Sequence, residues 1–156
     1  MKPKVGTLAP DFTAPVAVVA GGEAESVTLS DLKGEKVVLV FYPRDNTPGC
    51  TMQACALRDG WDAIANKARI YGISGDSVQS HQKFIGKRSL PYPLIADESG
   101  EIVRNYGVWV EKSMLGKKFM GIERSTFIID EEGKIATILE KVSPAKHYDL
   151  LLQALG

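Results

Sequence analysis

One stretch of the sequence decides the fold, Val37-Val38-Leu39-Val40-Phe41-Tyr42-Pro43-Arg44-Asp45-Asn46-Thr47-Pro48-Gly49-Cys50. Its first six residues are apolar and largely β-branched and stop at a proline, which predicts a short buried strand. Thr47 suits a helix cap, and Pro48 suits the first helical position because its missing N–H would have no partner there. Cys50 then falls in the first helical turn, where free N–H groups and the positive end of the helix dipole favour a thiolate. This position is typical of a reactive cysteine.

The composition is that of an ordinary globular protein. The chain has 156 residues, of which 44% are apolar and 24% charged, and this length is enough for one domain with its own core, residues 1–156. Nineteen Lys and Arg balance nineteen Asp and Glu, so the formal net charge is zero. Binding to nucleic acid or to an anionic membrane needs a basic excess, and neither is expected.

No apolar stretch approaches the roughly 18 to 20 residues that span a bilayer. The basic start, Met1–Thr7, has no apolar segment behind it, so a secretory signal is not expected and the cytoplasm is the predicted location. The two cysteines, Cys50 and Cys55, are five residues apart. In a reducing compartment this pair indicates catalytic or redox use more than a structural disulfide.

Hydrophobic periodicity and turn residues predict one α/β domain. The first expected elements are a hairpin from 11–19 and 26–29 around Gly21 and Gly22, a helical turn at 30–34, a strand at 37–42 and a helix at 48–66. A strand at 70–74, a helix at 77–88 capped by Ser77, a strand at 94–96 and a helix at 100–106 are expected next. The last part is expected to contain a strand at 108–110, a loop at 111–123, a hairpin from 124–130 and 134–140, and a helix at 144–155.

The helix predicted at 48–66 carries one apolar stripe, made of Cys50, Ala54, Leu57, Trp61 and Ile64. Cys55 lies about 140° from this stripe, since each residue turns ~100°. In an intact helix the Cα atoms of residues five apart are about 8.6 Å from each other, whereas a disulfide needs about 4.4 to 6.8 Å. The two cysteines are therefore not expected to bond while this helix is formed.

Three features together resemble the peroxiredoxins: a strand that ends in Phe41-Tyr42-Pro43, a threonine three residues before a cysteine at a helix start, and Arg124-Ser125-Thr126-Phe127-Ile128-Ile129-Asp130 near the end. The motif 45–51, with a second cysteine five residues after the first, is similar to the PrxQ or bacterioferritin-comigratory-protein subfamily. The resemblance runs along almost the whole chain. It implies a thioredoxin-like fold of the peroxiredoxin type, with a central mixed sheet flanked by helices and an N-terminal β-hairpin.

The resemblance also implies an activity and a set of site residues. The activity is reduction of hydrogen peroxide or organic hydroperoxides. Cys50 matches the peroxidatic cysteine and Cys55 the resolving one, while Pro43, Thr47 and Arg124 match the rest of the family's active site. The expected reductant is thioredoxin or a glutaredoxin-like dithiol protein. No metal, flavin or haem is implied, and the expected state is a monomer.

Position 53 departs from the pattern, because Gln53 stands where this subfamily leads us to expect a glutamate.

Other interpretations of the two cysteines, Thr47 and Pro43 stay open. A peroxide-sensing redox switch would use the same two cysteines, and a thioredoxin-like binding domain would leave Cys50 as a small buried apolar residue. Thr47 is either a helix cap or a catalytic hydroxyl, and Pro43 ends the strand, shields the thiolate, or does both.

Arg124 has a structural alternative as a solvated charge at a strand end. If its strand lies antiparallel beside residues 37–42, however, Arg124 falls next to Cys50 and its charge favours the thiolate. His81 and His147 are placed away from the cysteine motif, and with two Cys and two His at this spacing a zinc site is not expected.

Overall fold

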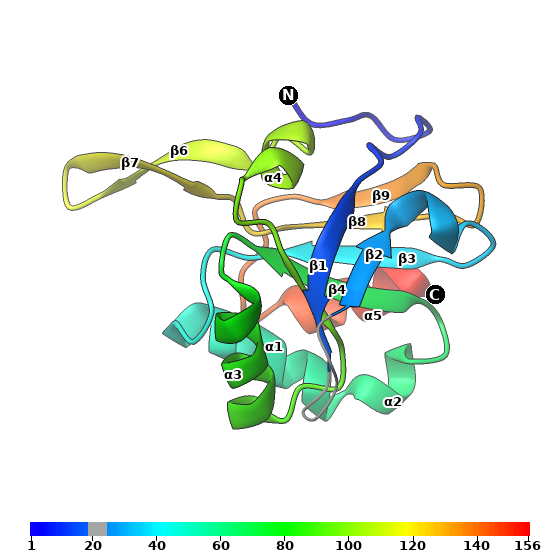
Figure 1. Cartoon of the computed structure of the whole chain (residues 1–156), viewed down its shortest axis with the longest axis horizontal. Helices are drawn as coiled ribbons and strands as arrows, with labels where there is room; N and C mark the ends of the chain where they lie inside the picture. The colour runs from blue at the N-terminus through cyan, green and yellow to red at the C-terminus, as the bar shows by residue number, and fades with distance from the viewer. Residues whose placement is uncertain (19–24) are drawn as a thin grey trace.

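The computed structural model describes residues 1–18 and 25–156. In these residues the main feature is a seven-stranded mixed sheet with the strand order β2-β1-β5-β4-β3-β8-β9 (Figure 1). Its strands are β1 (Thr13–Ala17), β2 (Glu25–Thr28), β3 (Val37–Phe41), β4 (Arg69–Ser74), β5 (Leu94–Ala96), β8 (Ser125–Ile129) and β9 (Ile135–Leu139).

Strand β3 is buried along its whole length, as its apolar sequence predicts. It pairs in parallel with β4 and antiparallel with β8, so both of its edges are hydrogen-bonded inside the sheet. Because successive side chains of a strand point to opposite faces, Leu39 and Phe41 join one apolar cluster while Val38 and Val40 join another. The strand therefore contributes to the core on both faces of the sheet.

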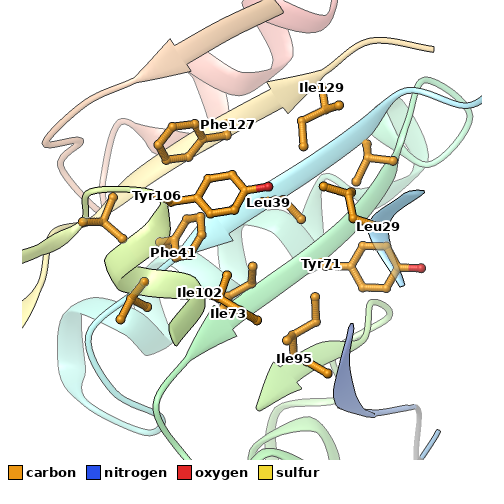
Figure 2. Packing of buried hydrophobic residues seen from close by; sticks show 14 of the residues in the cluster. Leu29, Leu39, Phe41, Tyr71, Ile73, Ile95, Ile102, Tyr106, Phe127 and Ile129 are labelled. Atoms are coloured by element: carbon orange, nitrogen blue, oxygen red, sulfur yellow. The ribbon is translucent and has the colours of Figure 1, made fainter. Parts of the chain in front are cut away.

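Helices cover the two faces, giving three layers (Figure 1). One layer contains α1 (Pro48–Asp59), α2 (Trp61–Ile64), α3 (Val78–Arg88) and α5 (His147–Leu155), and the other contains η1 (Leu29–Leu32) and α4 (Glu101–Asn105). On the second face, the rings of Phe41, Tyr106 and Phe127 pack with centroids 5.2 to 5.6 Å apart (Figure 2). The predicted mixed sheet with flanking helices is confirmed.

The predicted single helix over 48–66 is wrong, because Gly60 interrupts it. Helix α1 ends at Asp59 and α2 begins at Trp61. The Tyr148 hydroxyl donates a hydrogen bond to the Gly60 carbonyl (2.8 Å), and its ring occupies the space where a side chain at position 60 would stand. The contact with α5 thus fixes the break, and only glycine fits there.

The predicted loop over 111–123 is also wrong. Residues 109–122 form a second, two-stranded antiparallel sheet from β6 (Trp109–Met114) and β7 (Lys117–Ile122), which projects from the body (Figure 1). Leu115 and Gly116 make the turn with positive φ angles of 53° and 80°. Two consecutive positive φ values are typical of a tight hairpin turn, which usually carries Asn or Gly at its first central position.

Most other predicted elements are confirmed. Strands β1 and β2 pair antiparallel as the N-terminal hairpin, although Gly21 and Gly22 lie outside the described residues. Ser77 caps α3, since its hydroxyl accepts a hydrogen bond from the Ser80 backbone N–H (3.1 Å). Helix α5 begins at His147, three residues later than predicted. Among the described residues, no helix is long and apolar enough to cross a membrane.

Candidate active site

The pairing of β3 with β8 brings the cysteine motif next to Arg124. Phe41 at the end of β3 lies opposite Ser125 at the start of β8, so Arg124 lies beside the exit of β3. Arg124 Nη1 donates a hydrogen bond to Cys50 Sγ at 3.4 Å. Cys50 is only 3% exposed, and the contact is partly buried. The antiparallel pairing on which the expected role of Arg124 depends is present, and it places a permanent cation against the sulfur.

The start of α1 places Cys50 in the first helical turn. Pro48 is the first helical residue, and the Thr47 backbone carbonyl accepts the first intrahelical bond from the Thr51 N–H (2.8 Å). The predicted side-chain cap is not formed, however. The Thr47 hydroxyl donates to the Arg44 carbonyl (2.9 Å) and accepts no helix N–H. Pro43 lies half-buried in the turn that leaves β3.

Gln53 is the second partner of Arg124. Its side-chain oxygen Oε1 accepts a hydrogen bond from Arg124 Nη1 at 2.6 Å, and the residue is 2% exposed. One nitrogen of the guanidinium thus serves both Cys50 and Gln53. Gly49 makes room for this arrangement, since a Cβ there would lie 3.2 Å from Arg124 Nη2 and 3.3 Å from Pro144 Cγ.

Cys50 and Cys55 are both free thiols within α1. Cys50 is buried and Cys55 half-buried. The absence of a bond between them agrees with the expectation from helix geometry.

A small cavity of about 10 Å³ adjoins Cys50. It is lined by Val40, Tyr42, Cys50, Gln53, Ala54, Phe84 and Tyr92. Burial raises the pKa of Tyr92 far above its usual value, and the nearby Cys55, Asp45 and Cys50 raise it further. The Tyr92 hydroxyl is therefore neutral near pH 7. Space at this depth is enough for about one water-sized group.

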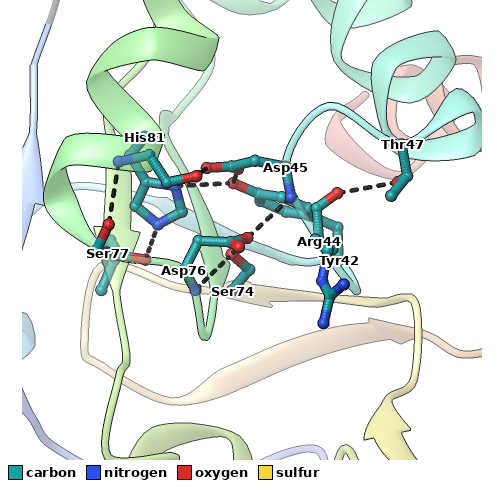
Figure 3. Close-up of polar contacts among 10 residues, drawn as sticks. Tyr42, Arg44, Asp45, Thr47, Ser74, Asp76, Ser77 and His81 are labelled. Atoms are coloured by element: carbon teal, nitrogen blue, oxygen red, sulfur yellow. Dashed lines mark hydrogen bonds and ion pairs between the residues drawn. The ribbon is translucent and has the colours of Figure 1, made fainter.

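A buried polar network holds the loop between β3 and α1 (Figure 3). Asp45 accepts hydrogen bonds from the Tyr42 hydroxyl (2.6 Å) and the Ser80 hydroxyl (2.8 Å), and lies 2.8 Å from His81 Nδ1. His81 Nε2 faces the Ile95 carbonyl at 2.9 Å. Burial raises the pKa of Tyr42 well above its usual value, with Asp45 adding to the shift.

The sequence-based placement of His81 away from the cysteine motif is wrong. His81 and Asp45 are 36 residues apart in the chain, and only the packing of α3 beside the loop brings them together. His81 is fully buried, so its ring belongs to this network and is not a surface group. Sequence spacing contains no signal for such a contact.

The network also forms a cluster of possible metal ligands, because single atoms of Asp45, Asp76 and His81 lie within 4.8 Å of one another. Each of these atoms already has hydrogen-bond partners. Asp76 Oδ2 accepts from the Ser74 hydroxyl (2.6 Å) and from the Asp45 N–H (2.8 Å), and Asp45 Oδ2 faces His81 and Ser80. The cluster is therefore explained as hydrogen bonding among protein groups.

His147, the first residue of α5, contacts β8 close to Arg124 in the sequence. Its Nε2 is 2.7 Å from the Thr126 hydroxyl, and the side chain is fully buried. Burial lowers the pKa of His147 to about 4, and the positive charge of Arg124 contributes to the shift. The ring is consequently neutral near pH 7 and adds no charge to the site.

Known proteins resemble this chain along nearly its whole length. The AhpC/TSA family model matches residues 5–138. Peroxiredoxin Bcp from Bacillus subtilis is 42% identical, with 97% of this chain and 94% of the relative covered, and peroxiredoxin Bcp from Escherichia coli K12 is 38% identical, with 96% and 93% covered. Among solved structures, a PrxQ variant from Xylella fastidiosa has a TM-score of 0.87 at 29% identity, covering 99% of this chain and 96% of that one. Peroxiredoxin Q from Xanthomonas campestris has a TM-score of 0.80 at 37% identity, covering 90% and 88%.

Fold and site together define a class, the thioredoxin-fold proteins that use a cysteine thiol at a helix start for redox chemistry. Within this class, the chain belongs to the AhpC/TSA family and is a peroxiredoxin of the Bcp and PrxQ group. Its activity is that of a thiol-dependent peroxidase, and the redox-switch alternative is not favoured.

Proposed function

We propose that Cys50 is the residue that reduces the peroxide. Its sulfur attacks one oxygen, an S–O bond forms, and the O–O bond breaks with its electron pair on the departing oxygen, which takes up a proton. Sulfur is oxidised by two electrons to a sulfenic acid, and the peroxide is reduced to water or an alcohol. The observation that supports this assignment is the 3.4 Å contact from Arg124 Nη1 to a sulfur in the first turn of α1.

Three neighbouring residues support the reaction in this proposal. The Arg124 guanidinium favours the thiolate and stabilises the charge that grows on the departing oxygen. The Thr47 hydroxyl does not cap α1, and in this proposal it forms a hydrogen bond with the peroxide. Pro43 ends β3 and limits the access of water to the sulfur.

Cys55 is the resolving thiol in this proposal. Its sulfur attacks the sulfenic sulfur, an S–S bond forms, and water leaves. Both cysteines lie within the twelve-residue helix α1, so its first turns must unwind before the sulfurs meet. A thioredoxin or glutaredoxin-like dithiol protein then takes up the disulfide by exchange and returns both thiols. Such dithiol reductants operate in a reducing compartment, for which we propose the cytoplasm, with the monomer as the working form.

Steady-state peroxide consumption with thioredoxin, thioredoxin reductase and NADPH tests these roles. We expect Cys50→Ser to abolish turnover. Cys55→Ser should consume one equivalent of peroxide and then stop, with Cys50 found as a sulfenic acid by dimedone labelling and intact mass. Sustained turnover by either variant would contradict the assignment of that cysteine. An intact mass of the peroxide-treated wild type that is two hydrogens lower, with no free thiol, would support the disulfide.

A further inference from the structure

Gln53 has a buried amide nitrogen without a partner. Oε1 faces Arg124, and no acceptor lies within hydrogen-bond distance of Nε2 among the described residues, although the side chain is 2% exposed. A guanidinium only donates hydrogen bonds, so the amide must present its oxygen to Arg124. Nε2 therefore carries free N–H groups on a side chain that lines the same cavity as Cys50.

The guanidinium that Gln53 holds has no acidic partner. In the described part of the chain, no carboxylate forms a salt bridge with Arg124. The adjacent Glu123 is engaged elsewhere, by Lys2 Nζ at 2.8 Å and by the Ser125 hydroxyl at 2.5 Å. The positive charge of Arg124 is thus uncompensated on the side that faces the sulfur.

We propose that Gln53 is a positioning residue whose neutral amide determines how strongly Arg124 favours the Cys50 thiolate. Its oxygen holds the guanidinium beside the sulfur, as a glutamate would, but adds no negative charge that would offset the cation. Its N–H groups, unpaired among the described residues, belong to a side chain that lines the Cys50 cavity. This inference rests on the proposed role of Cys50 as nucleophile.

The other charged and titratable groups around Cys50 and Arg124 come from several elements. They are Lys112 on β6, Glu123 before β8, Tyr42 and Asp45 after β3, Cys55 on α1, Tyr92 before β5 and His147 on α5. Tyr92 and His147 are neutral near pH 7, and Asp45 is hydrogen-bonded within its own network. Burial lowers the pKa of Lys112, and the charge of Arg124 lowers it further.

Within residues 1–18 and 25–156, the side chains that hydrogen-bond to Arg124 are those of Gln53 and Cys50, and both are on α1. A change of charge at position 53 should therefore act on Cys50 more directly than a change at any of the other groups.

Two substitutions separate charge from hydrogen bonding. Gln53→Glu keeps the shape and the acceptor for Arg124 but adds a negative charge, whereas Gln53→Met stays neutral and loses the acceptor. Gln153→Glu, on an exposed residue of α5, makes the same change of net charge away from the site. Each is made in the Cys55→Ser background. The rate of iodoacetamide alkylation of Cys50 is then measured from pH 4 to 9, together with the rate constant for hydrogen peroxide.

We expect Gln53→Glu to move the alkylation midpoint up by about one pH unit, so that the rate falls about tenfold at pH values well below the parent midpoint and recovers at high pH. Gln53→Met adds no charge, so it should raise the midpoint less than Gln53→Glu does, and it should react more slowly with peroxide at every pH, since Arg124 is less well held. Gln153→Glu should match the parent in both measurements.

An unchanged midpoint in Gln53→Glu would overturn the proposal, as would an equal shift in Gln53→Met. Thermal unfolding by circular dichroism checks that each variant is folded. If Gln53→Glu does not fold, Gln53→Met decides, and a shift of one pH unit in that neutral variant would refute the role of charge. A parent protein whose Cys50 alkylates like free cysteine would instead contradict the proposed function itself.

Discussion

At the scale of single residues, Thr47 is the position where local structure and chemistry can be separated. Its hydroxyl donates to the Arg44 carbonyl and caps no helix N–H, so α1 begins without the side-chain cap that the sequence predicts. Removing this hydroxyl costs one partly exposed hydrogen bond, which contributes about 1 kcal/mol.

We therefore predict that Thr47→Val lowers the rate of peroxide reduction by about 100-fold or more, within the range for one positioned catalytic group, while the free energy of unfolding changes by about 1 kcal/mol or less. Stopped-flow oxidation and urea unfolding measure the two quantities. Thr47→Ser keeps the hydroxyl and should retain most of the rate. A folded Thr47→Val with the wild-type rate would leave Thr47 with a structural role only.

The sequence patterns predicted the candidate catalytic residues better than they predicted the side chains around them. The strand, proline and helix-start signals around Cys50 are local. The sequence also predicts a strand after Arg124, but its antiparallel pairing with β3, which places Arg124 beside Cys50, is seen only in the structure. The contact of Asp45 with His81 depends on how α3 packs against the loop, and no local pattern contains that information.

At the scale of secondary-structure elements, Asp45 ties the loop after β3 to α3 and, through Asp76, to the end of β4 (Figure 3). The network lies directly before α1, the helix whose first turns must open in the proposed cycle. In the proposed unwinding of α1, the network keeps the loop before the helix in place, because the loop stays hydrogen-bonded to α3 and to the end of β4.

We predict that Asp45→Ala lowers the free energy of unfolding by about 3 to 5 kcal/mol, because it leaves the buried Tyr42 hydroxyl and His81 ring, and the partly buried Ser80 hydroxyl, without their acceptor. Asp59→Ala is the matched control, since Asp59 is an exposed residue whose surface ion pair with Arg58 contributes less than about 1 kcal/mol. Urea unfolding at pH 7 compares them. Equal, small losses in both variants would contradict the importance of the network.

The β6–β7 hairpin shows why some strands cannot be predicted from the sequence. Leu115 occupies the first central position of its turn with a φ of 53°, a conformation that leucine rarely adopts. Met114, Leu115 and Met120 are exposed, so the strands lack the alternation that burial on one face imposes. Without a recognisable turn or an alternating pattern, a strand pair reads as a loop.

At the scale of the whole molecule, His147 couples stability to pH. Its pKa is lowered to about 4 in the folded protein, against about 6.5 in an unfolded chain. Between these values the unfolded state binds more protons, so stability is fully present above pH 6.5 and is lost as the pH falls toward 4. The loss due to this residue is at most roughly 3 kcal/mol.

We predict that His147→Gln flattens this dependence. Chemical unfolding of the wild type and the variant at several values between pH 4.5 and 7 gives the difference in slope, and the variant should lose less stability over that interval. The carboxylates titrate mostly below it, so they contribute little to the difference. Parallel curves for the two proteins would exclude His147 as the source.

The global architecture was the most predictable part of the molecule. Alternating strand and helix signals between residues 37 and 96 predict an α/β domain, and in the structure β3, β4 and β5 from this segment pair in parallel. The break at Gly60 was not predictable, because it depends on Tyr148, 88 residues further along the chain.

The position of Trp61 makes the intrinsic fluorescence of the protein sensitive to the surroundings of the cysteines. Its indole stacks on the Tyr92 ring with centroids 5.9 Å apart, at the end of the segment that carries both cysteines, and Tyr92 lines the Cys50 cavity. The chain has one other tryptophan, Trp109, which stands on the projecting hairpin. If oxidation rearranges α1 as proposed, the emission of Trp61 should change against a steady background from Trp109, so intrinsic fluorescence would follow each catalytic cycle without a label.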